Sequence, residues 1–195
     1  MLQKNILVKL YLREGKSVQE VAGAFNNSPS GIRYWMKKYN IKSRTISEAI
    51  YQKNNPNGDP FKLKYPSTIE GAKLFGLGVG LYWGEGTKAD KNTVRLGNTD
   101  PDLIKKFIEF LTRIFQVSKD DMKFGLQLFT DIDEKDAMLF WTKKLKIKRE
   151  QFYKVSVNIS TRTGTYRKKS RYGVLTVYYH NKKMRDLLVS LLPKN

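Results

Sequence analysis

The most informative pattern in the chain lies in STIEGAKLFGLGVGLYWGEGTK, residues 67–88. Ser67 and Glu70 have the spacing of a capping box, which predicts that a helix begins here and covers 68–84. Small residues recur at every fourth position of this helix and therefore lie in one stripe. They are Ala72, Gly76, Gly80 and Gly84. A glycine inside a helix costs about 1 kcal/mol relative to alanine, and close approach of another helix is the usual compensation.

The stripe therefore predicts a helix–helix contact, and a second copy of the chain could supply the partner helix. The alternative is packing inside the core of one chain. Glu85 follows between Gly84 and Gly86, where the helix should end. A two-fold related helix would bring a second Glu85 close, and two facing carboxylates form an oxygen-rich site for Mg²⁺ beside a phosphate. Glu85 is therefore the candidate catalytic and metal-binding residue; the alternative is an ordinary surface residue.

The nine residues from Gly78 to Gly86 resemble the motif of the LAGLIDADG homing endonucleases, and the resemblance extends over about 67–192. The Gly-Leu pair, the final acid and the closing glycine are kept. The resemblance implies that Glu85 binds the catalytic metal and that the motif helix forms the dimer interface. It also implies a mixed α/β domain with an antiparallel sheet. The stretch 94–115 resembles the strand and helix that follow the motif in the family.

The chain differs from the family pattern at three places. Gly78 replaces the first leucine, and Trp83 replaces the earlier acid. About ten residues separate Gly86 from Gly97, which is too few for a long first hairpin, and an additional helix is expected near 133–146. Some members of the family retain the fold as transcription regulators. A non-catalytic DNA-binding regulator is therefore the alternative to an endonuclease.

Residues 1–45 predict a small all-α domain of three short helices. Ser17 and Glu20 form a second capping box, and Ser28 followed by Pro29 begins the third helix. The stretch SVQEVAGAFNNSPSGIRYWMKKYNI, 17–41, resembles the helix-turn-helix of resolvase-like and phage-type DNA-binding proteins. Such a second helix can enter the major groove of DNA. Its expected outward residues are Ser28, Ser30, Arg33, Tyr34, Lys37 and Lys38; the alternative is a helical bundle with a solvated basic face.

Residues 46–66 contain a run of turn-forming residues and predict a linker. From residue 67 onward the hydrophobic patterns predict an α+β domain over 67–195. Helices are expected near 68–84, 101–116, 133–146 and 182–192. Strands are expected near 93–98, 123–130, 152–160 and 173–180.

The charge balance predicts a polyanionic partner. The 195 residues include 37 Lys and Arg against 18 Asp and Glu, a net charge of +19. A basic hairpin tip over 162–171 could follow the phosphates of double-stranded DNA, and polar strand residues could meet the base edges. The candidate tip residues are Arg162, Arg167, Lys168, Lys169 and Arg171. The candidate strand residues are Arg95, Asn98, Lys123, Gln127, Lys154, Ser156 and Asn158; the alternative for the tip is a solvated loop.

The composition excludes several chemistries. The chain has no cysteine and one histidine, His180, so zinc fingers and zinc-dependent deaminases are excluded. A catalytic metal must then be a hard cation held by carboxylates, Mg²⁺ or another divalent ion. We expect no small-molecule cofactor, no membrane segment, and a cytoplasmic, nucleoid-associated location.

The sequence thus predicts a site-specific, Mg²⁺-dependent endonuclease that cleaves double-stranded DNA as a homodimer. An RNA-binding or intron-splicing accessory protein is a third possibility.

Overall fold

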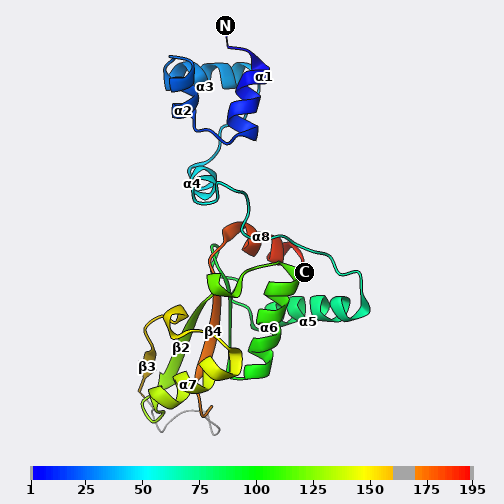
Figure 1. Cartoon of the computed structure of the whole chain (residues 1–195), viewed down its shortest axis with the longest axis vertical. Coiled ribbons are helices and arrows are strands. Elements are labelled where there is room, and N and C mark those ends of the chain that lie inside the picture. The colour runs from blue at the N-terminus through cyan, green and yellow to red at the C-terminus, as the bar shows by residue number, and fades with distance from the viewer. Residues whose placement is uncertain (1, 160–169, 194–195) are drawn as a thin grey trace. The chain divides into compact units, whose positions relative to one another are not determined.

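The computed structural model describes residues 2–159 and 170–193. The chain divides into two compact units, Met1–Pro60 and Phe61–Asn195 (Figure 1). Each unit has its own cluster of buried apolar side chains. Within the described residues no helix combines the length and the hydropathy needed to cross a bilayer.

The first unit is all helical. Its helices are α1 (Lys4–Leu7), continued by a π-helical segment (Val8–Arg13), then α2 (Val18–Ala24), α3 (Pro29–Lys38) and α4 (Ile46–Asn54). The core includes Leu7, Tyr11, Val21, Ile32 and Met36. These residues recur at helical spacing, and this explains why the three-helix pattern could be predicted from the sequence.

Helices α2 and α3 begin as the sequence predicted. The Ser17–Glu20 capping box is formed, and the Ser28 hydroxyl accepts the N–H of Gly31 with Pro29 in the first turn. Four residues separate the two helices, and Asn26 adopts a positive φ of 46° between them. The first unit therefore contains two capped helices joined by a tight turn.

The stretch expected to be a linker is divided between the two units. Helix α4 begins at a third capping box, Thr45–Glu48, whose T-x-x-E spacing is present in the sequence. Arg44 ties this part of the chain to the first unit by donating to the main-chain oxygens of Gly15 and Lys16. Further on, Lys62 N–H donates to the carbonyl oxygen of Phe115 at 2.8 Å, within the second unit. The predicted linker of 46–66 is thus replaced by a helix and a docked extended segment.

The second unit contains helices and a four-stranded sheet, so the α+β class is confirmed. The helices are α5 (Ile69–Glu85), α6 (Pro101–Ile114), α7 (Glu134–Leu145) and α8 (Lys182–Ser190). The strands are β1 (Val94–Asn98), β2 (Lys123–Phe129), β3 (Ser156–Asn158) and β4 (Val174–Tyr179). All lie where the sequence predicted them, except that β3 is much shorter than 152–160.

The sheet is mixed, which corrects the expectation of an antiparallel sheet. Its order is β1-β4-β2-β3; β4 is antiparallel to β1 and β2, whereas β2 and β3 are parallel. The reason is α7, which connects β2 to β3 as a crossover and returns the chain in the same direction. Before β1, the chain forms only an isolated antiparallel bridge between Gly86 and Leu96.

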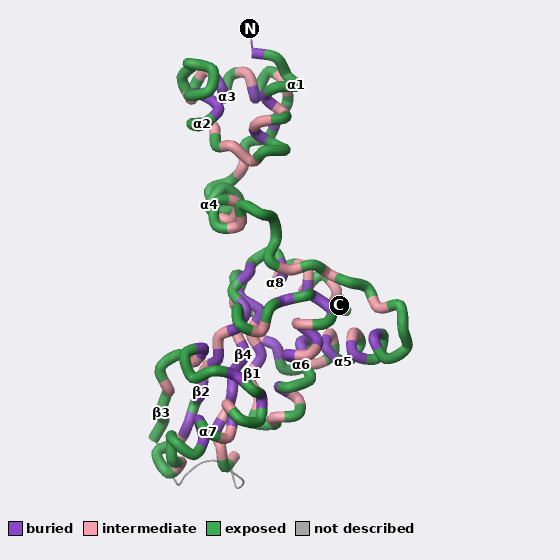
Figure 2. Tube along the Cα trace, in the orientation of Figure 1, coloured by how far each residue is buried: buried purple, intermediate pink, exposed green. Residues whose placement is uncertain are grey.

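One face of the sheet carries the core. Alternate residues of β1, β2 and β4, such as Leu96, Leu126 and Val177, are buried in the same apolar cluster as side chains of the four helices. The other alternate residues are only partly covered or exposed, except Thr176 in the middle of β4, which is buried. Figure 2 shows the inner strand β4 largely buried, β2 alternating between buried and less buried residues, and the short edge strand β3 exposed. The helices therefore cover one face and leave the opposite face open.

Candidate nucleic-acid interface

Helix α5 begins one residue later than the capping-box prediction. The side chain of Thr68, not Ser67, accepts the N–H of Gly71 at 3.1 Å. Glu70 consequently does not close a capping box; its carboxylate pairs with Arg113 of α6 at 3.2 Å. The helix then runs for 17 residues to Glu85.

The two sides of α5 differ in character. Gly71, Leu74, Gly78 and Tyr82 face the core, and a Cβ built on Gly78 would lie 2.1 Å from the ring of Phe110. The close approach of α5 to α6 therefore depends on Gly78, which lies outside the predicted stripe.

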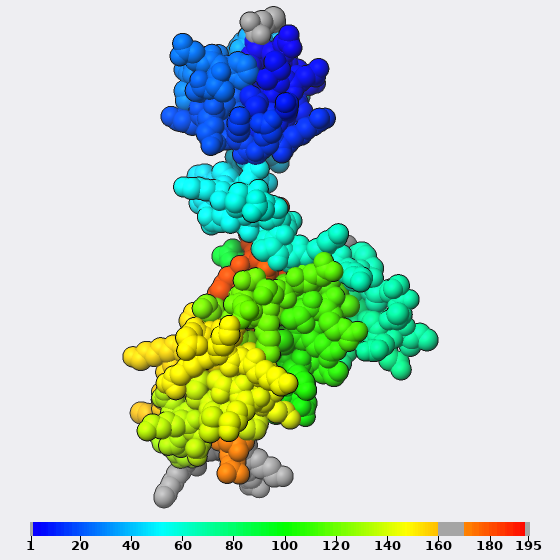
Figure 3. All heavy atoms as spheres, viewed as in Figure 1, coloured from blue at the N-terminus to red at the C-terminus, as the bar shows by residue number. Residues whose placement is uncertain are grey.

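The predicted stripe lies on the exposed side of α5. A Cβ built on Gly76, Gly80 or Gly84 would have no atom within 4 Å, and Ala72 is exposed. Ile69, Leu77 and Trp83 are also exposed, by 78%, 46% and 54%. The alternative in which the stripe packs inside one chain's core is therefore wrong. Figure 3 shows the α5 segment, in teal, projecting from the surface of the second unit.

Glu85 lies at the last turn of this helix with its side chain exposed. The Glu85 side chain forms no hydrogen bond or ion pair with any residue in 2–159 or 170–193. The described residues also contain no group of three or more His, Cys, Asp or Glu side chains that could hold a metal. Glu85 therefore offers one unengaged carboxylate per chain, and Mg²⁺ is commonly held by one or two carboxylates together with substrate phosphates.

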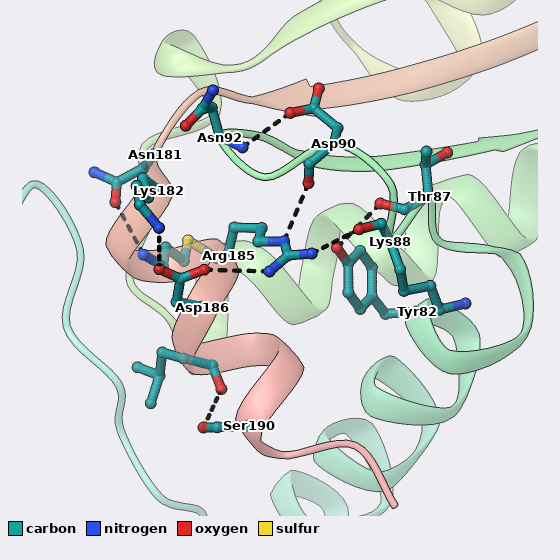
Figure 4. Close-up of polar contacts among 12 residues, drawn as sticks. Tyr82, Thr87, Lys88, Asp90, Asn92, Asn181, Lys182, Arg185, Asp186 and Ser190 are labelled. Atoms are coloured by element: carbon teal, nitrogen blue, oxygen red, sulfur yellow. Dashed lines mark hydrogen bonds and ion pairs between the residues drawn. The ribbon is translucent and has the colours of Figure 1, made fainter. Parts of the chain in front are cut away.

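The loop after Glu85 is held by α8. Arg185 donates from Nε to the main-chain oxygen of Asp90 at 3.1 Å and from Nη2 to that of Lys88 at 2.6 Å. Figure 4 shows this guanidinium reaching from α8 between the loop and Tyr82. The N–H of Asn92 donates to the Asp90 carboxylate and lowers the pKa of Asp90. Lys88 and Asp90 are thus engaged in loop structure.

The open face of the sheet brings together most of the strand residues predicted to read DNA. In the strand register Arg95 and Lys123 both pair with Tyr178, and Gln127 pairs with Ser156. Asn158 has the same alternation as Ser156, and Lys154 is exposed just before β3. Candidate residues from separate strands therefore share one surface.

Asn98 does not share that surface, which corrects its predicted position. Its register partner is the buried Leu175, and its side-chain oxygen accepts the N–H of Asp100 at 2.9 Å. Asn98 therefore shapes the turn from β1 into α6.

Residues predicted to face outward from α3 do so. Ser28, Ser30, Arg33, Tyr34, Lys37 and Lys38 are all exposed, whereas Ile32 and Met36 are buried on the opposite side. Lys38 lies over the ring of Trp35, 5.0 Å from its centroid. Helix α3 thus presents a continuous basic and polar face.

The predicted basic tip is described only at its end. Arg162, Arg167, Lys168 and Lys169 lie outside the described residues. Arg171 is exposed, and its guanidinium lies 5.4 Å from the ring centroid of Tyr172.

Three ring-bearing residues on the open face were not predicted as site residues. Tyr153, Tyr178 and His180 contact one another there. Tyr178 and His180 share the outward alternation of β4, a signal available in the sequence. The position of Tyr153 depends on the tertiary structure, since its N–H donates to the carbonyl oxygen of Phe124 in β2.

Comparisons of the chain with protein-family models, curated proteins and solved structures found no match. The fold and the site define an α+β protein in which one sheet face is open, polar and basic and an exposed helix ends in an unengaged carboxylate.

Proposed function

We propose that this chain is a DNA endonuclease of the LAGLIDADG type that acts as a homodimer. The observation that carries the proposal is the exposed face of α5, which ends at Glu85. Gly76, Gly80 and Gly84 weaken the helix by about 1 kcal/mol each relative to alanine, and nothing within the described chain makes use of their missing side chains. A second α5 packed on this face would make use of them.

Each chain would contribute one half of the active site. Two α5 helices in contact along Gly80 and Gly84 would bring two Glu85 carboxylates toward each other, next to the scissile phosphates of a bound duplex. When Mg²⁺ is bound, it supplies an activated water and stabilises the leaving oxygen. Arg185 keeps the loop after Glu85 in place through the main chain of Lys88 and Asp90.

The open sheet face supports DNA as the partner. The four strands contain no acidic residue, and their charged residues are Arg95 and Lys123. Such a face can approach phosphates without repulsion, while Gln127, Ser156 and Asn158 offer hydrogen bonds to base edges. The face of α3 would extend the recognised sequence in the manner of a helix-turn-helix.

The catalytic step is tested by cleavage of double-stranded DNA in Mg²⁺ by wild type, Glu85→Gln and Glu70→Gln. Glu70 is an acid of the same helix at its opposite end, paired with Arg113, so its variant is the matched control. We expect cleavage by wild type and Glu70→Gln and none by Glu85→Gln. Equal cleavage by all three would refute the role of Glu85.

The dimer is tested separately by sedimentation. Gly80→Leu should sediment as a monomer because leucine would keep the helices apart. Gly23→Leu is the control, since Gly23 in α2 also has no atom within 4 Å of a built Cβ. A dimer that persists in Gly80→Leu would contradict the interface.

A non-catalytic DNA-binding regulator is the second candidate. The observation that favours it is that Glu85 has no acidic, histidine or cysteine cluster beside it among the described residues. This candidate predicts salt-sensitive DNA binding, with no metal-dependent cleavage by wild type.

A further inference from the structure

Tyr153, Tyr178 and His180 form a cluster on the open side of the sheet, hereafter the aromatic corner. None of the three belongs to the core cluster or to the side chains packed against it. Tyr153 is 43% exposed, His180 is exposed, and Tyr178 is half-buried. The core therefore does not explain why three rings gather here.

The rings are held in fixed orientations. The Tyr178 and His180 planes are 19° apart, and the Tyr153 plane lies at 81° to Tyr178 and 64° to His180. The Tyr153 hydroxyl and His180 Nε2 are 2.5 Å apart, and Nδ1 of His180 is 3.1 Å from the Thr93 hydroxyl. With Tyr153 donating to Nε2, the Nδ1 proton is donated to Thr93. Both ring nitrogens are thus engaged, and binding would require little reordering of the rings.

The surroundings of the corner are basic. Arg95 lies over Tyr178, 5.1 Å from the ring centroid, and Lys123 is the register neighbour of Tyr178 on the other side. In the next row of the sheet, Thr176 lies between Gly97 and Gly125. A Cβ built on Gly125 would lie 3.0 Å from the Tyr178 ring, and one on Gly97 would lie 2.8 Å from the Thr176 hydroxyl, so the two glycines make room for these side chains.

This combination fits an unpaired nucleobase better than a paired one. Both ring faces of a base inside a duplex are covered by its neighbours, so only its edge is accessible. An unpaired base can place its π-face on an aromatic side chain, while nearby cations hold the adjoining phosphates. Tyr153 and His180 offer exposed rings, and Arg95 and Lys123 offer the cations.

We propose that the aromatic corner binds an unpaired base of DNA by stacking on Tyr153, with the His180 ring, whose plane lies at 64° to that of Tyr153, meeting the base at an angle. The inference rests on the proposed function in that the open sheet face is taken to bind DNA. The inference adds a specific ligand to that function: a nucleotide that has left the base stack of the duplex. The other candidate DNA-binding residues do not distinguish such a nucleotide from a paired one. The helix-turn-helix pattern in the same chain favours DNA over RNA as its source.

The test uses the full chain with a duplex carrying one bulged 2-aminopurine and the same duplex without the bulge. 2-Aminopurine fluorescence falls on stacking, so it reports contact with the rings directly. We expect tighter binding of the bulged duplex and fluorescence quenching by wild type. Tyr153→Leu should reduce the preference by about 10-fold, the scale of one lost base–aromatic stack, whereas Tyr153→Phe should retain most of it.

Tyr65→Leu is the matched control, because Tyr65 is 67% exposed outside the sheet. Equal affinity for the two duplexes would overturn the stacking proposal, as would a preference that survives in Tyr153→Leu. With either of these two results, binding of the paired duplex would still be consistent with the proposed function. The proposed function would instead be refuted if the protein did not bind the paired duplex but still quenched the 2-aminopurine fluorescence of a single strand. Tighter binding of an RNA of the same sequence would overturn the assignment to DNA.

Discussion

Arg185 of α8 and Lys88 of the loop after α5 are joined by a hydrogen bond of 2.6 Å from Nη2 to the main-chain oxygen. They are separated by 97 positions in the sequence. The contact fixes the loop that leads from Glu85 into β1, and the Arg185 side chain is only 14% exposed. A charged donor in such a position stabilises the fold by about 1.5–3 kcal/mol.

Replacing Arg185 should therefore destabilise the second unit. We expect Arg185→Met to lower the free energy of unfolding by about 2 kcal/mol, because the carbonyl oxygens of Lys88 and Asp90 lose their donor. Lys182→Met is the control, since Lys182 forms only a 2.6 Å exposed ion pair with Asp186 in the same helix. Urea denaturation measures both, and equal midpoints for the two variants would contradict this role.

The two sides of α5 should respond oppositely to an added methyl group. Gly78→Ala would place its Cβ 2.1 Å from the Phe110 ring and should destabilise the chain by about 1–3 kcal/mol. Gly80→Ala enters open space and should stabilise the helix by about 1 kcal/mol. Thermal unfolding at low protein concentration distinguishes the two. Destabilisation by both substitutions would show that the face at Gly80 is not open within one chain.

The α3 face should control the salt dependence of DNA binding. The double variant Lys37→Ala, Lys38→Ala should reduce the slope of log affinity against log salt by about 1.8, the value for two lost phosphate contacts. Lys9→Ala is the control, because Lys9 lies outside α3 and pairs with Glu14 at 3.8 Å. A titration at several salt concentrations measures the slopes; an unchanged slope in the double variant would remove α3 from the interface.

Glu109 should contribute to the acid sensitivity of the fold. Hydrogen bonds from Lys106 and then Arg113 lower the pKa of Glu109. A carboxylate whose pKa is lowered on folding stabilises the native state above its unfolded pKa of about 4.3. That stabilisation is lost as the pH falls through the lower folded value.

Glu109→Gln should therefore flatten the decline in stability below about pH 4.3. Denaturation midpoints measured from neutral to acidic pH in wild type and variant give the comparison. Parallel profiles would show that other carboxylates account for the acid response.

The sequence alone determined the local elements. Capping residues such as Ser17 and Ser28 predicted where helices begin, because a short polar side chain there satisfies free backbone N–H groups. Apolar periodicity placed α6, α7 and α8 and the strands β1, β2 and β4. The stripe of small residues on α5 and the alternation that puts Arg95 and Lys123 on one face were likewise readable from spacing.

The tertiary structure decided what spacing does not encode. The α5 stripe is exposed because α6 packs against the other side of the helix. The Phe110 ring of α6 lies against Gly78 and not against Gly80. The parallel pairing of β2 with β3 followed from the path of α7. The meeting of Tyr153 with His180 joins residues 27 positions apart. Such contacts are set by packing between distant segments, whereas caps and periodicity are set by neighbours in the chain.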